Sequence, residues 1–276
     1  MKVNYDDRKI LQQAEVELTK AFVEFCYYNN LRYFIMGGTL LGAVRHHGFI
    51  PWDDDMDVGM PRKDYERMQE ILAQEGNAIK HFPFVTYKNS DTIEYVARLE
   101  NPDVQIIDRS AATPVQRNSW IDIFPLDGMP NNARLRKLHG LNLLRIRMML
   151  KYSEFDQVSV NLTERPLTER VLIKVGKILQ PEKFLSTGKS LNKLDKALKK
   201  FDYDKCDYMV NFMGAYKLKE MFPKSDYGEG RLYTFGDMKL NGPENYDAIL
   251  TQMYGANYME PPSEQIKNKH FTEVVK

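Results

Sequence analysis

The 276-residue sequence has few cysteines, no long apolar run and almost no net charge. Its two cysteines, Cys26 and Cys206, lie far apart and form no CxxC or metal-ligand spacing, which fits a reduced protein better than a disulfide scaffold. No segment approaches the length of uncharged apolar residues that a membrane-spanning helix needs, and the N-terminus lacks the pattern of a signal peptide. Because 39 basic residues balance 38 acidic ones, no overall field draws the chain to nucleic acid. We therefore expect a cytoplasmic protein without a nucleic-acid partner.

Apolar periodicity predicts alternating helices and strands in the first part of the chain. Apolar residues recur at steps of three and four over 6–30, which is typical of an amphipathic helix. The aromatic and β-branched segment 32–36 predicts a short strand, which stops at the double glycine 37–38 before another helix. A strand is expected over 55–60, and the proline that follows it is well placed to open a helix over 62–74.

More strands and then helices complete the predicted fold. Strands are expected over 84–88, 93–100, 104–109 and 119–128, and helices over about 131–151, 164–179 and 182–200. The order predicts an α/β (α+β) fold, a mixed sheet with flanking helices. Since strands give way to helices near residue 130, we expect a core over 1–130 and a helical, aromatic-rich region over 131–276 that completes the substrate site.

A dense cluster of negative charge follows the turn GFIPW. Aspartates occupy positions 53, 54, 55 and 57. Carboxylates this close repel one another and raise one another's pKa unless a cation lies between them. A run of acidic residues is commonly a solvated turn, but the interleaved Ile50, Trp52 and Met56 indicate a partly buried backbone that faces a polar cavity. The segment therefore predicts a cation site.

Two known uses of closely spaced aspartates fit this segment poorly. Asp53, Asp55 and Asp57 have the alternate spacing of a calcium-binding EF-hand loop, but Val58 stands where the turn glycine is needed and Asp64 where the bidentate glutamate is needed. A haloacid-dehalogenase site, with Asp55 as nucleophile and Asp57 as acid, needs a long apolar strand before the first aspartate. The residues found there are FIPWDD.

A phosphate-transfer site accounts for all of these features together. A glycine turn at the start of a helix binds phosphate oxygens through unpaired backbone N–H groups. Asp55 and Asp57, predicted on one strand face, supply the hard oxygen ligands that Mg²⁺ prefers. Asp122, predicted between two isoleucines in a later strand, adds a third carboxylate.

The same residues resemble a known family. Gly37-Gly38-Thr39, followed after a spacer by Asp55-Met56-Asp57-Val58, is similar to the signature of the nucleotidyltransferase fold. The longer segment GTLLGAVRHHGFIPWDDDMDVGMPRKDY closely resembles the LicD family within that superfamily, and WIDIFPLDG (120–128) and the stretch 222–262 are similar to its later blocks. The resemblance implies a nucleotidyltransferase-like catalytic core.

The resemblance also implies a reaction. LicD-type enzymes transfer phosphocholine from CDP-choline to a hydroxyl of a cell-surface glycan such as teichoic acid or lipopolysaccharide, releasing CMP. Their relatives of the fukutin type transfer ribitol phosphate. The implied partners are therefore CDP-choline or a related CDP-alcohol and a glycan or lipid-linked glycan acceptor, which leaves peripheral contact with the inner face of the cell membrane open.

Seven residues carry over to the implied site. The substrate phosphates would be held by Gly37, Gly38 and Thr39, and Arg45 would steer the diphosphate or form a surface ion pair. Mg²⁺ or Mn²⁺ would be held by the catalytic carboxylates Asp55, Asp57 and Asp122. Whether Asp122 binds a second metal or accepts the acceptor's proton stays open.

Other donors and another class of protein also stay open. The transferred group could be ribitol or glycerol phosphate, or the donor could be a nucleotide sugar, because an Asp-x-Asp pair also holds a metal against a diphosphate in glycosyltransferases. A non-catalytic nucleotide-binding or glycan-binding protein is the alternative outside enzymes, and the intact Asp122 argues against it. A choline cage is a further hypothesis, since quaternary ammonium groups favour aromatic faces. It would be built from some of the aromatic residues of the C-terminal third: Tyr227, Tyr233, Phe235, Tyr246, Tyr254 and Tyr258.

Overall fold

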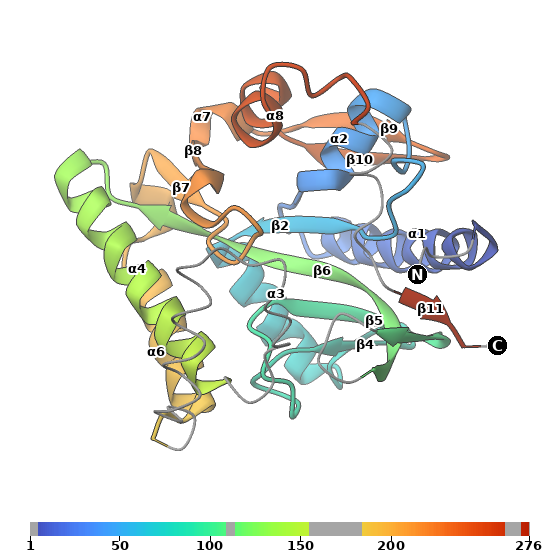
Figure 1. Ribbon diagram of the computed structural model, residues 1–276, viewed down its shortest axis with the longest axis horizontal. Helices are drawn as coiled ribbons and strands as arrows, with labels where there is room; N and C mark the ends of the chain where they lie inside the picture. Colours follow the sequence, from blue (N-terminus) through green and yellow to red (C-terminus); the bar gives the residue numbers. More distant parts are fainter. Residues whose placement is uncertain (1–4, 109–113, 155–183, 263–271, 276) are drawn as a thin grey trace, which may run out of the picture.

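A mixed nine-stranded sheet runs through the centre of the computed structural model, which describes residues 5–108, 114–154, 184–262 and 272–275 (Figure 1). Its strands are β1 (Phe34–Ile35), β2 (Asp57–Pro61), β3 (Ala78–Ile79), β4 (Phe82–Val85), β5 (Ala97–Asp108), β6 (Val115–Met129), β7 (Tyr208–Val210), β8 (Met221–Pro223) and β11 (Thr272–Val274). The main order is β1-β2-β6-β5-β4-β3, with β11 beside β5, and with β7 and then β8 extending the far end of β6. β2 and β6 pair in parallel, and every neighbouring pair beside them is antiparallel.

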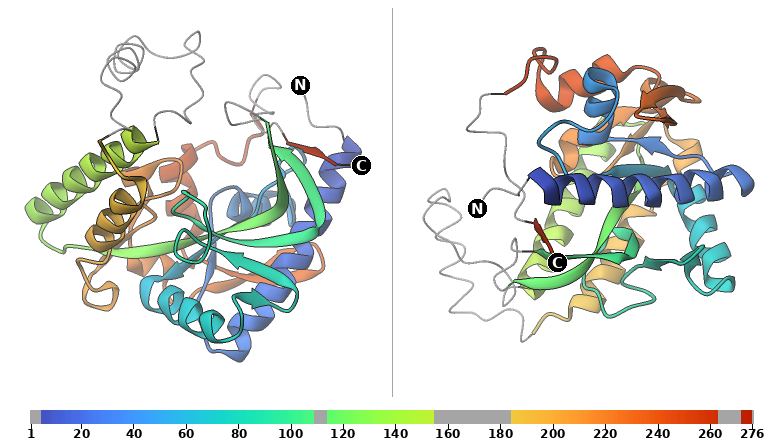
Figure 2. Two further views of the ribbon diagram at one scale, coloured as in Figure 1. Left: turned by 90° about the horizontal axis from the view of Figure 1, so that it is seen from below. Right: turned by 90° about the vertical axis from the view of Figure 1, so that its right-hand side faces the viewer.

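Helices flank this sheet at both ends, as the sequence predicted for an α/β fold. They are α1 (Tyr5–Tyr28), α2 (Gly37–His46), α3 (Arg62–Gln74), α4 (Ala133–Ser153), α6 (Thr187–Leu198), α7 (Lys224–Tyr227) and α8 (Tyr246–Tyr254), with short 3-10 turns η3 (Tyr203–Lys205) and η4 (Lys217–Glu220). Helices α4 and α6 lie side by side at the end of the sheet away from α1 (Figure 2). The hairpin of β9 (Arg231–Phe235) and β10 (Met238–Gly242) lies with α2 and α8 beside β1 and β2 (Figure 1). In the described ranges no helix has both the length and the apolar character to cross a bilayer.

Local signals explain where several helices begin. Helix α3 starts directly after Pro61, and its bounds are those expected from the sequence. Helix α4 is capped by Asn132, whose side-chain oxygen accepts hydrogen bonds from the backbone N–H groups of Arg134 (3.0 Å) and Leu135 (3.1 Å). Such a cap satisfies two of the donors that a helix start leaves unpaired.

The structure differs from the predicted elements in two places, and a third prediction falls outside the described residues. The strands expected over 93–100 and 104–109 are one strand, β5, in which a bulge between Asn101 and Gln105 interrupts the periodicity. β2 begins at Asp57, so Asp55 precedes the strand and does not share a strand face with Asp57. The helix expected over 164–179 lies outside the described residues.

One apolar core joins the two predicted regions. In β6, the fully buried Ile121 and Ile123 pack in the same cluster as Leu18 of α1 and Met68 of α3. That cluster extends to residues as late as Tyr258, so the core draws on both sides of the boundary expected near residue 130. The division at that boundary stays a prediction.

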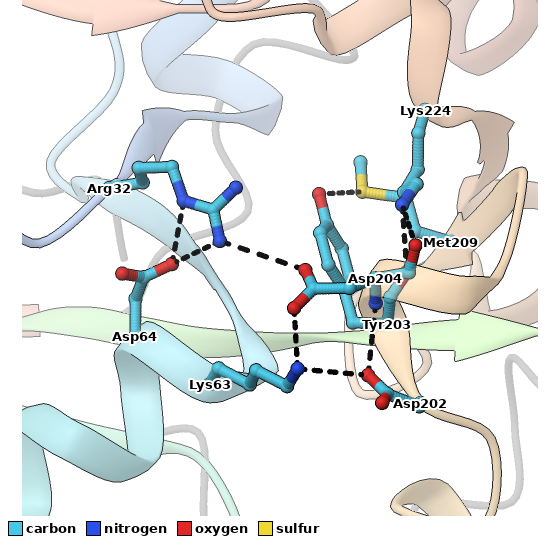
Figure 3. A network of polar contacts seen from close by, with 8 residues as sticks. All are labelled: Arg32, Lys63, Asp64, Asp202, Tyr203, Asp204, Met209 and Lys224. Atoms are coloured by element: carbon cyan, nitrogen blue, oxygen red, sulfur yellow. Dashed lines mark hydrogen bonds and ion pairs between the residues drawn. The ribbon is translucent and has the colours of Figure 1, made fainter.

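A network of ion pairs also links the start of the chain to its second half (Figure 3). Arg32 Nη2 lies 2.8 Å from Asp64 Oδ2, and Lys63 Nζ lies 2.5 Å from Asp204 Oδ2 and 3.4 Å from Asp202 Oδ1. Most of these side chains are well exposed, so each pair stabilises the fold only weakly. The apolar core is therefore the main link between the two regions.

Candidate active site

Parallel pairing of β2 with β6 brings two of the predicted carboxylates together. Asp57, the first residue of β2, lies opposite Asp122 of β6. Residues in register on neighbouring strands project to the same face of a sheet. The Asp122 N–H donates to the Met56 carbonyl oxygen at 3.0 Å, which holds the loop before β2 to the same strand.

Helix α1 fixes the acidic loop through hydrogen bonds from its side chains. Gln12 Nε2 donates to the Asp53 carbonyl oxygen at 2.8 Å, and the Thr19 hydroxyl donates to Met56 Sδ at 3.1 Å. Glu15 is buried close to the loop, and its pKa is raised by burial and then by the nearby aspartates. No part in the site was predicted for α1, because its only signal in the sequence is that polar residues occur on the buried side of an amphipathic helix.

Three aspartates of this loop open into a cavity of about 510 Å³. Asp53, Asp55 and Asp57 line it together with Gly37 and Gly38 from the start of α2. The structure thus brings the predicted glycine turn and the predicted Asp-x-Asp pair to one cavity. Asp122 is the neighbour of Asp57 on β6, but it is not among the residues that line the cavity in the described structure.

The two glycines let the start of α2 approach these carboxylates closely. Gly37 has a φ of +53°, which L-residues with a side chain rarely adopt, and a Cβ there would lie 3.2 Å from Asp57 Oδ2. A Cβ on Gly38 would lie only 2.7 Å from Asp53 Oδ2. Met36, at the N-cap position, has no side-chain oxygen to cap the helix. The backbone N–H groups at this helix start are therefore suited to an anion.

Two of the predicted phosphate-binding residues have other contacts in this structure. The buried Thr39 hydroxyl accepts a hydrogen bond from the Asp57 N–H at 2.8 Å and so ties α2 to β2. Arg45 Nη1 donates to the Tyr258 carbonyl oxygen at 2.8 Å, and the guanidinium lies 5.7 Å from the Trp52 ring centre. Neither residue is among those that line the cavity in the described structure.

The carboxylates of the cavity raise one another's pKa. Burial, followed by the charge of Asp55, raises the pKa of Asp53 to about 9. The pKa of Asp57 is raised by burial and then by Asp55 and Asp122. Like charges this close need a cation or a proton between them, so the cluster is a place where positive charge is favoured.

Asp122 has a different environment because an arginine faces it. Arg98 lies opposite Asp122 on β5, and its Nε lies 3.3 Å from Asp122 Oδ1. Burial raises the pKa of Asp122 to about 6, and Arg98 together with a hydrogen bond from the Trp120 side chain limits the rise. The charge of Asp122 therefore changes close to neutral pH.

The second half of the chain supplies the opposite wall of the cavity. Glu220 is buried there, and it accepts hydrogen bonds from Asn211 Nδ2 (2.7 Å) and from the Tyr216 backbone N–H (2.8 Å). The rings of Tyr216 and Tyr254, both lining the cavity, pack edge to face with centres 6.1 Å apart. Of these residues only Tyr254 was predicted from the sequence to take part in the site, because the loop that carries the others has no periodic pattern.

The donor set fits a hard divalent cation in its chemistry. Across the described ranges, no three His, Cys, Asp or Glu side chains already meet in the arrangement of a metal site. However, Asp53, Asp55 and Asp57 line one cavity, and the pKa values of Asp53 and Asp57 are raised by neighbouring carboxylates. Carboxylate oxygens are the ligands that Mg²⁺ and Mn²⁺ prefer. Metal binding by Asp55, Asp57 and Asp122 stays a prediction.

This cluster predicts an unusual dependence of stability on pH in metal-free protein. The pKa values of Asp53 (about 9) and Asp122 (about 6) exceed the value of about 3.9 for an unfolded aspartate, so the folded state binds more protons between those limits. Stability in EDTA should therefore fall as pH rises from about 5 to 9. Millimolar Mg²⁺ should oppose that fall, most strongly at high pH. Thermal melting across this range checks both effects.

The matched variant for this measurement is Asp53→Asn, which should flatten the decline in EDTA. Carboxyls with lowered pKa, such as Asp195, lose their stabilising effect only in more acidic solution and leave this window unaffected. A melting temperature in EDTA that rises between pH 5 and 9, or that ignores Mg²⁺, would contradict the prediction.

Comparison with known proteins identifies a family domain around this cavity. Residues 30–132 match the family described as LicD/FKTN/FKRP, nucleotidyltransferase domain. The matched segment contains the glycine turn, the acidic loop and Asp122. It ends before the residues that form the opposite wall of the cavity.

Individual relatives show similarity of different extent. The chain is 28% identical to the lipopolysaccharide cholinephosphotransferase LicD of Haemophilus influenzae over 257 residues, which are 91% of each chain. It is 48% identical over 68 residues to an uncharacterized protein of Rickettsia typhi, which covers 24% of this chain and 22% of that protein. Human ribitol 5-phosphate transferase FKRP is 39% identical over 49 residues, which are 18% of this chain and 10% of FKRP.

Proposed function

We propose that this chain, in which residues 30–132 match the nucleotidyltransferase domain of the LicD family, transfers a phosphate-linked alcohol from a CDP-alcohol donor to a glycan hydroxyl. The preferred donor is CDP-choline, and the products are CMP and a phosphocholine-bearing glycan such as teichoic acid or lipopolysaccharide. The enzyme is then a metal-dependent phosphotransferase of the CDP-alcohol type. The similarity to a cholinephosphotransferase over 91% of the chain supports this choice.

One observation carries the proposal. The cavity combines a helix start without a capping side chain, at Gly37 and Gly38, with carboxylates on the facing loop. A helix start binds phosphate oxygens, and carboxylates that raise one another's pKa favour a cation. A diphosphate with a bound cation satisfies both sides of this cavity at once.

The residues of the chain have distinct parts in the proposed reaction. The N–H groups of Gly37 and Gly38 hold the donor phosphates, and Asp55 and Asp57 would hold a divalent cation that supplies positive charge against the diphosphate. The acceptor oxygen attacks the phosphorus that bears the alcohol, and the bond from that phosphorus to the oxygen of CMP breaks in line. Asp122, with a pKa of about 6, is suited to accept the proton of the acceptor hydroxyl.

A donor panel tests the proposed function. CDP-choline, CDP-ribitol, CDP-glycerol and a nucleotide sugar are each incubated with Mg²⁺ and a teichoic-acid or lipopolysaccharide acceptor. We expect release of CMP from CDP-choline, with its phosphorus recovered on the acceptor by ³¹P spectroscopy. CMP released only from CDP-ribitol or CDP-glycerol would keep the reaction and change the alcohol. Release of a nucleoside diphosphate from the sugar donor alone would favour a glycosyltransferase. If the donors bind but none is consumed, the result would favour a non-catalytic binding protein.

Two tyrosines are suited to a cationic head group. Tyr216 and Tyr254 stand nearly perpendicular in the cavity wall, at 87°, next to the buried carboxyl of Glu220. Each aromatic face contributes about 0.5–2 kcal/mol to binding a quaternary ammonium group. The other aromatic residues proposed for a cage include Tyr227, Tyr233 and Phe235, which are buried in the core.

We expect Tyr216→Ala to weaken the binding of CDP-choline more than the binding of a donor whose alcohol carries no positive charge. The KM for CDP-choline should rise by about two- to thirtyfold, since roughly 1.4 kcal/mol corresponds to a factor of ten. The KM for CDP-glycerol, which has no cation, should change much less. Tyr27→Ala, at a side chain that is 81% exposed outside the cavity, is the control. Equal losses for both donors would show that Tyr216 does not select the head group.

The proposal also concerns where the reaction takes place. Cys26 and Cys206 are buried free thiols, which agrees with the reduced cytoplasm. A lipid-linked glycan acceptor would bring the chain into peripheral contact with the inner face of the membrane. Cell fractionation with and without a high-salt wash tests both parts of this statement.

A further inference from the structure

We infer that a polar pocket on the face of β5 and β6 binds a neutral sugar unit of the acceptor. This pocket lies on the side of Asp122 away from the donor cavity, which is the cavity lined by Asp53, Asp55 and Asp57. The inference rests on the proposed transfer to a glycan hydroxyl and names the surface that would present this hydroxyl. The pocket has a volume of about 300 Å³, at the lower end of the range for small-molecule sites.

The pocket and the donor cavity lie on opposite sides of one carboxylate. Asp57, which lines the donor cavity, is the neighbour of Asp122 on β2. Arg98, which lines the polar pocket, is the neighbour of Asp122 on β5 and contacts its carboxylate at 3.3 Å. The three side chains therefore form a row across β2, β6 and β5, with Asp122 in the middle.

This arrangement suits in-line transfer. Attack at phosphorus requires the incoming hydroxyl and the leaving CMP on opposite sides of the transferred group. If the donor occupies the cavity on the Asp57 side, a hydroxyl that reaches Asp122 from the Arg98 side has the opposite approach. A sugar held in the polar pocket would thus bring its hydroxyl to the carboxylate proposed to accept the proton.

The charges in the pocket favour a neutral polyol over a second phosphate. Glu94 and Glu100 are balanced by Arg98 and Arg117. Glu94 forms ion pairs with both arginines. Its Oε1 lies 3.0 Å from Arg117 Nη1, and its Oε2 contacts Arg98 Nη2. With its positive charges already paired, the pocket has no free cation for an anion in its described lining.

The same groups offer donors and acceptors side by side, as vicinal hydroxyls require. Asn118 Nδ2 donates to Glu100 Oε2 at 3.0 Å, and both side chains retain further hydrogen-bonding capacity. Trp120, half-buried on the same face, lies under the Arg98 guanidinium, which is 4.2 Å from its ring centre. Paired carboxylates, amides and guanidinium groups can bind the hydroxyls of a pyranose ring.

The test separates acceptor binding from donor binding. Glu100→Gln and Asn118→Ala are the variants, because the hydrogen bond of these two side chains is with each other and not with Asp122. Transfer is assayed with the donor that the parent consumes and with methyl glycosides of hexoses as acceptors. We expect the acceptor KM to rise about three- to tenfold in each variant, as the loss of one hydrogen bond predicts, with the donor KM much less affected. Melting temperatures verify that both variants fold.

Arg145→Ala, on the exposed side of α4, is the matched control and should leave both KM values unchanged. Unchanged acceptor KM values in both pocket variants, or changes confined to the donor KM, would overturn the inference. So would a parent enzyme that accepts only phosphate-bearing polyols. If the parent consumes no donor, the proposed function fails, and calorimetric titration of the same glycosides tests the pocket separately. Binding to the parent that weakens in both variants would support a sugar site in the pocket. No binding to the parent would overturn the inference.

Discussion

Asp57→Asn and Asp55→Asn should each lower turnover by about a hundredfold or more, because each removes a charge that the diphosphate and its cation require. Both side chains line the donor cavity. Since burial and neighbouring carboxylates raise the pKa of Asp57, its loss as an anion also relieves repulsion. Metal-free Asp57→Asn should therefore melt at the same temperature as the parent or higher, and Mg²⁺ should stabilise it less. Steady-state kinetics and melting with and without Mg²⁺ measure the two effects.

Asp237→Asn is the control for both variants. Asp237 forms an ion pair with Lys20, and its side chain is 71% exposed. The Asp237→Asn variant should therefore retain full activity and the full response of its melting temperature to Mg²⁺. Turnover within about tenfold of the parent in either active-site variant would remove that residue from the proposed machinery. A variant that loses activity and also melts earlier in EDTA would instead indicate a structural role.

Asp122→Asn should suppress transfer about a hundredfold or more while donor binding changes little, because general acid–base catalysis commonly contributes that much and the donor is held elsewhere. The amide has nearly the shape of the carboxyl, so Arg98 and the strand register should remain in place. The kcat at saturating acceptor is expected to fall, and the Kd for CDP-choline, measured by calorimetry in the absence of acceptor, to stay near that of the parent.

Asp103→Asn, at an exposed position of β5, is the matched control on the neighbouring strand. A large loss of donor affinity in Asp122→Asn would assign Asp122 to donor or metal binding in place of proton transfer. Activity close to that of the parent would exclude both roles.

Much of the fold could be predicted because its signals are local. Pro61 opens α3 where expected, and the alternation around Ile121 and Ile123 predicts the strand that holds Asp122. The bulge in β5 could not be predicted, because the three extra residues between Asn101 and Gln105 break the period on which strand assignment depends. The same limit applies to Asp127, which is buried in β6 and bonded to Arg62, because the two residues lie 65 positions apart in the chain.

The sequence by itself determined the chemistry for which this site is suited: a glycine turn at a helix start favours an anion, and carboxylates crowded into one short segment favour a cation, whatever the fold. Only the tertiary structure decided which distant residues join them. The parallel register of β2 and β6 sets Asp122 beside Asp57, and packing of the second half of the chain brings Glu220 and Tyr216 to the same cavity. Periodicity and turn chemistry act over a few residues, whereas strand register and the shared apolar core depend on contacts between segments far apart in the chain.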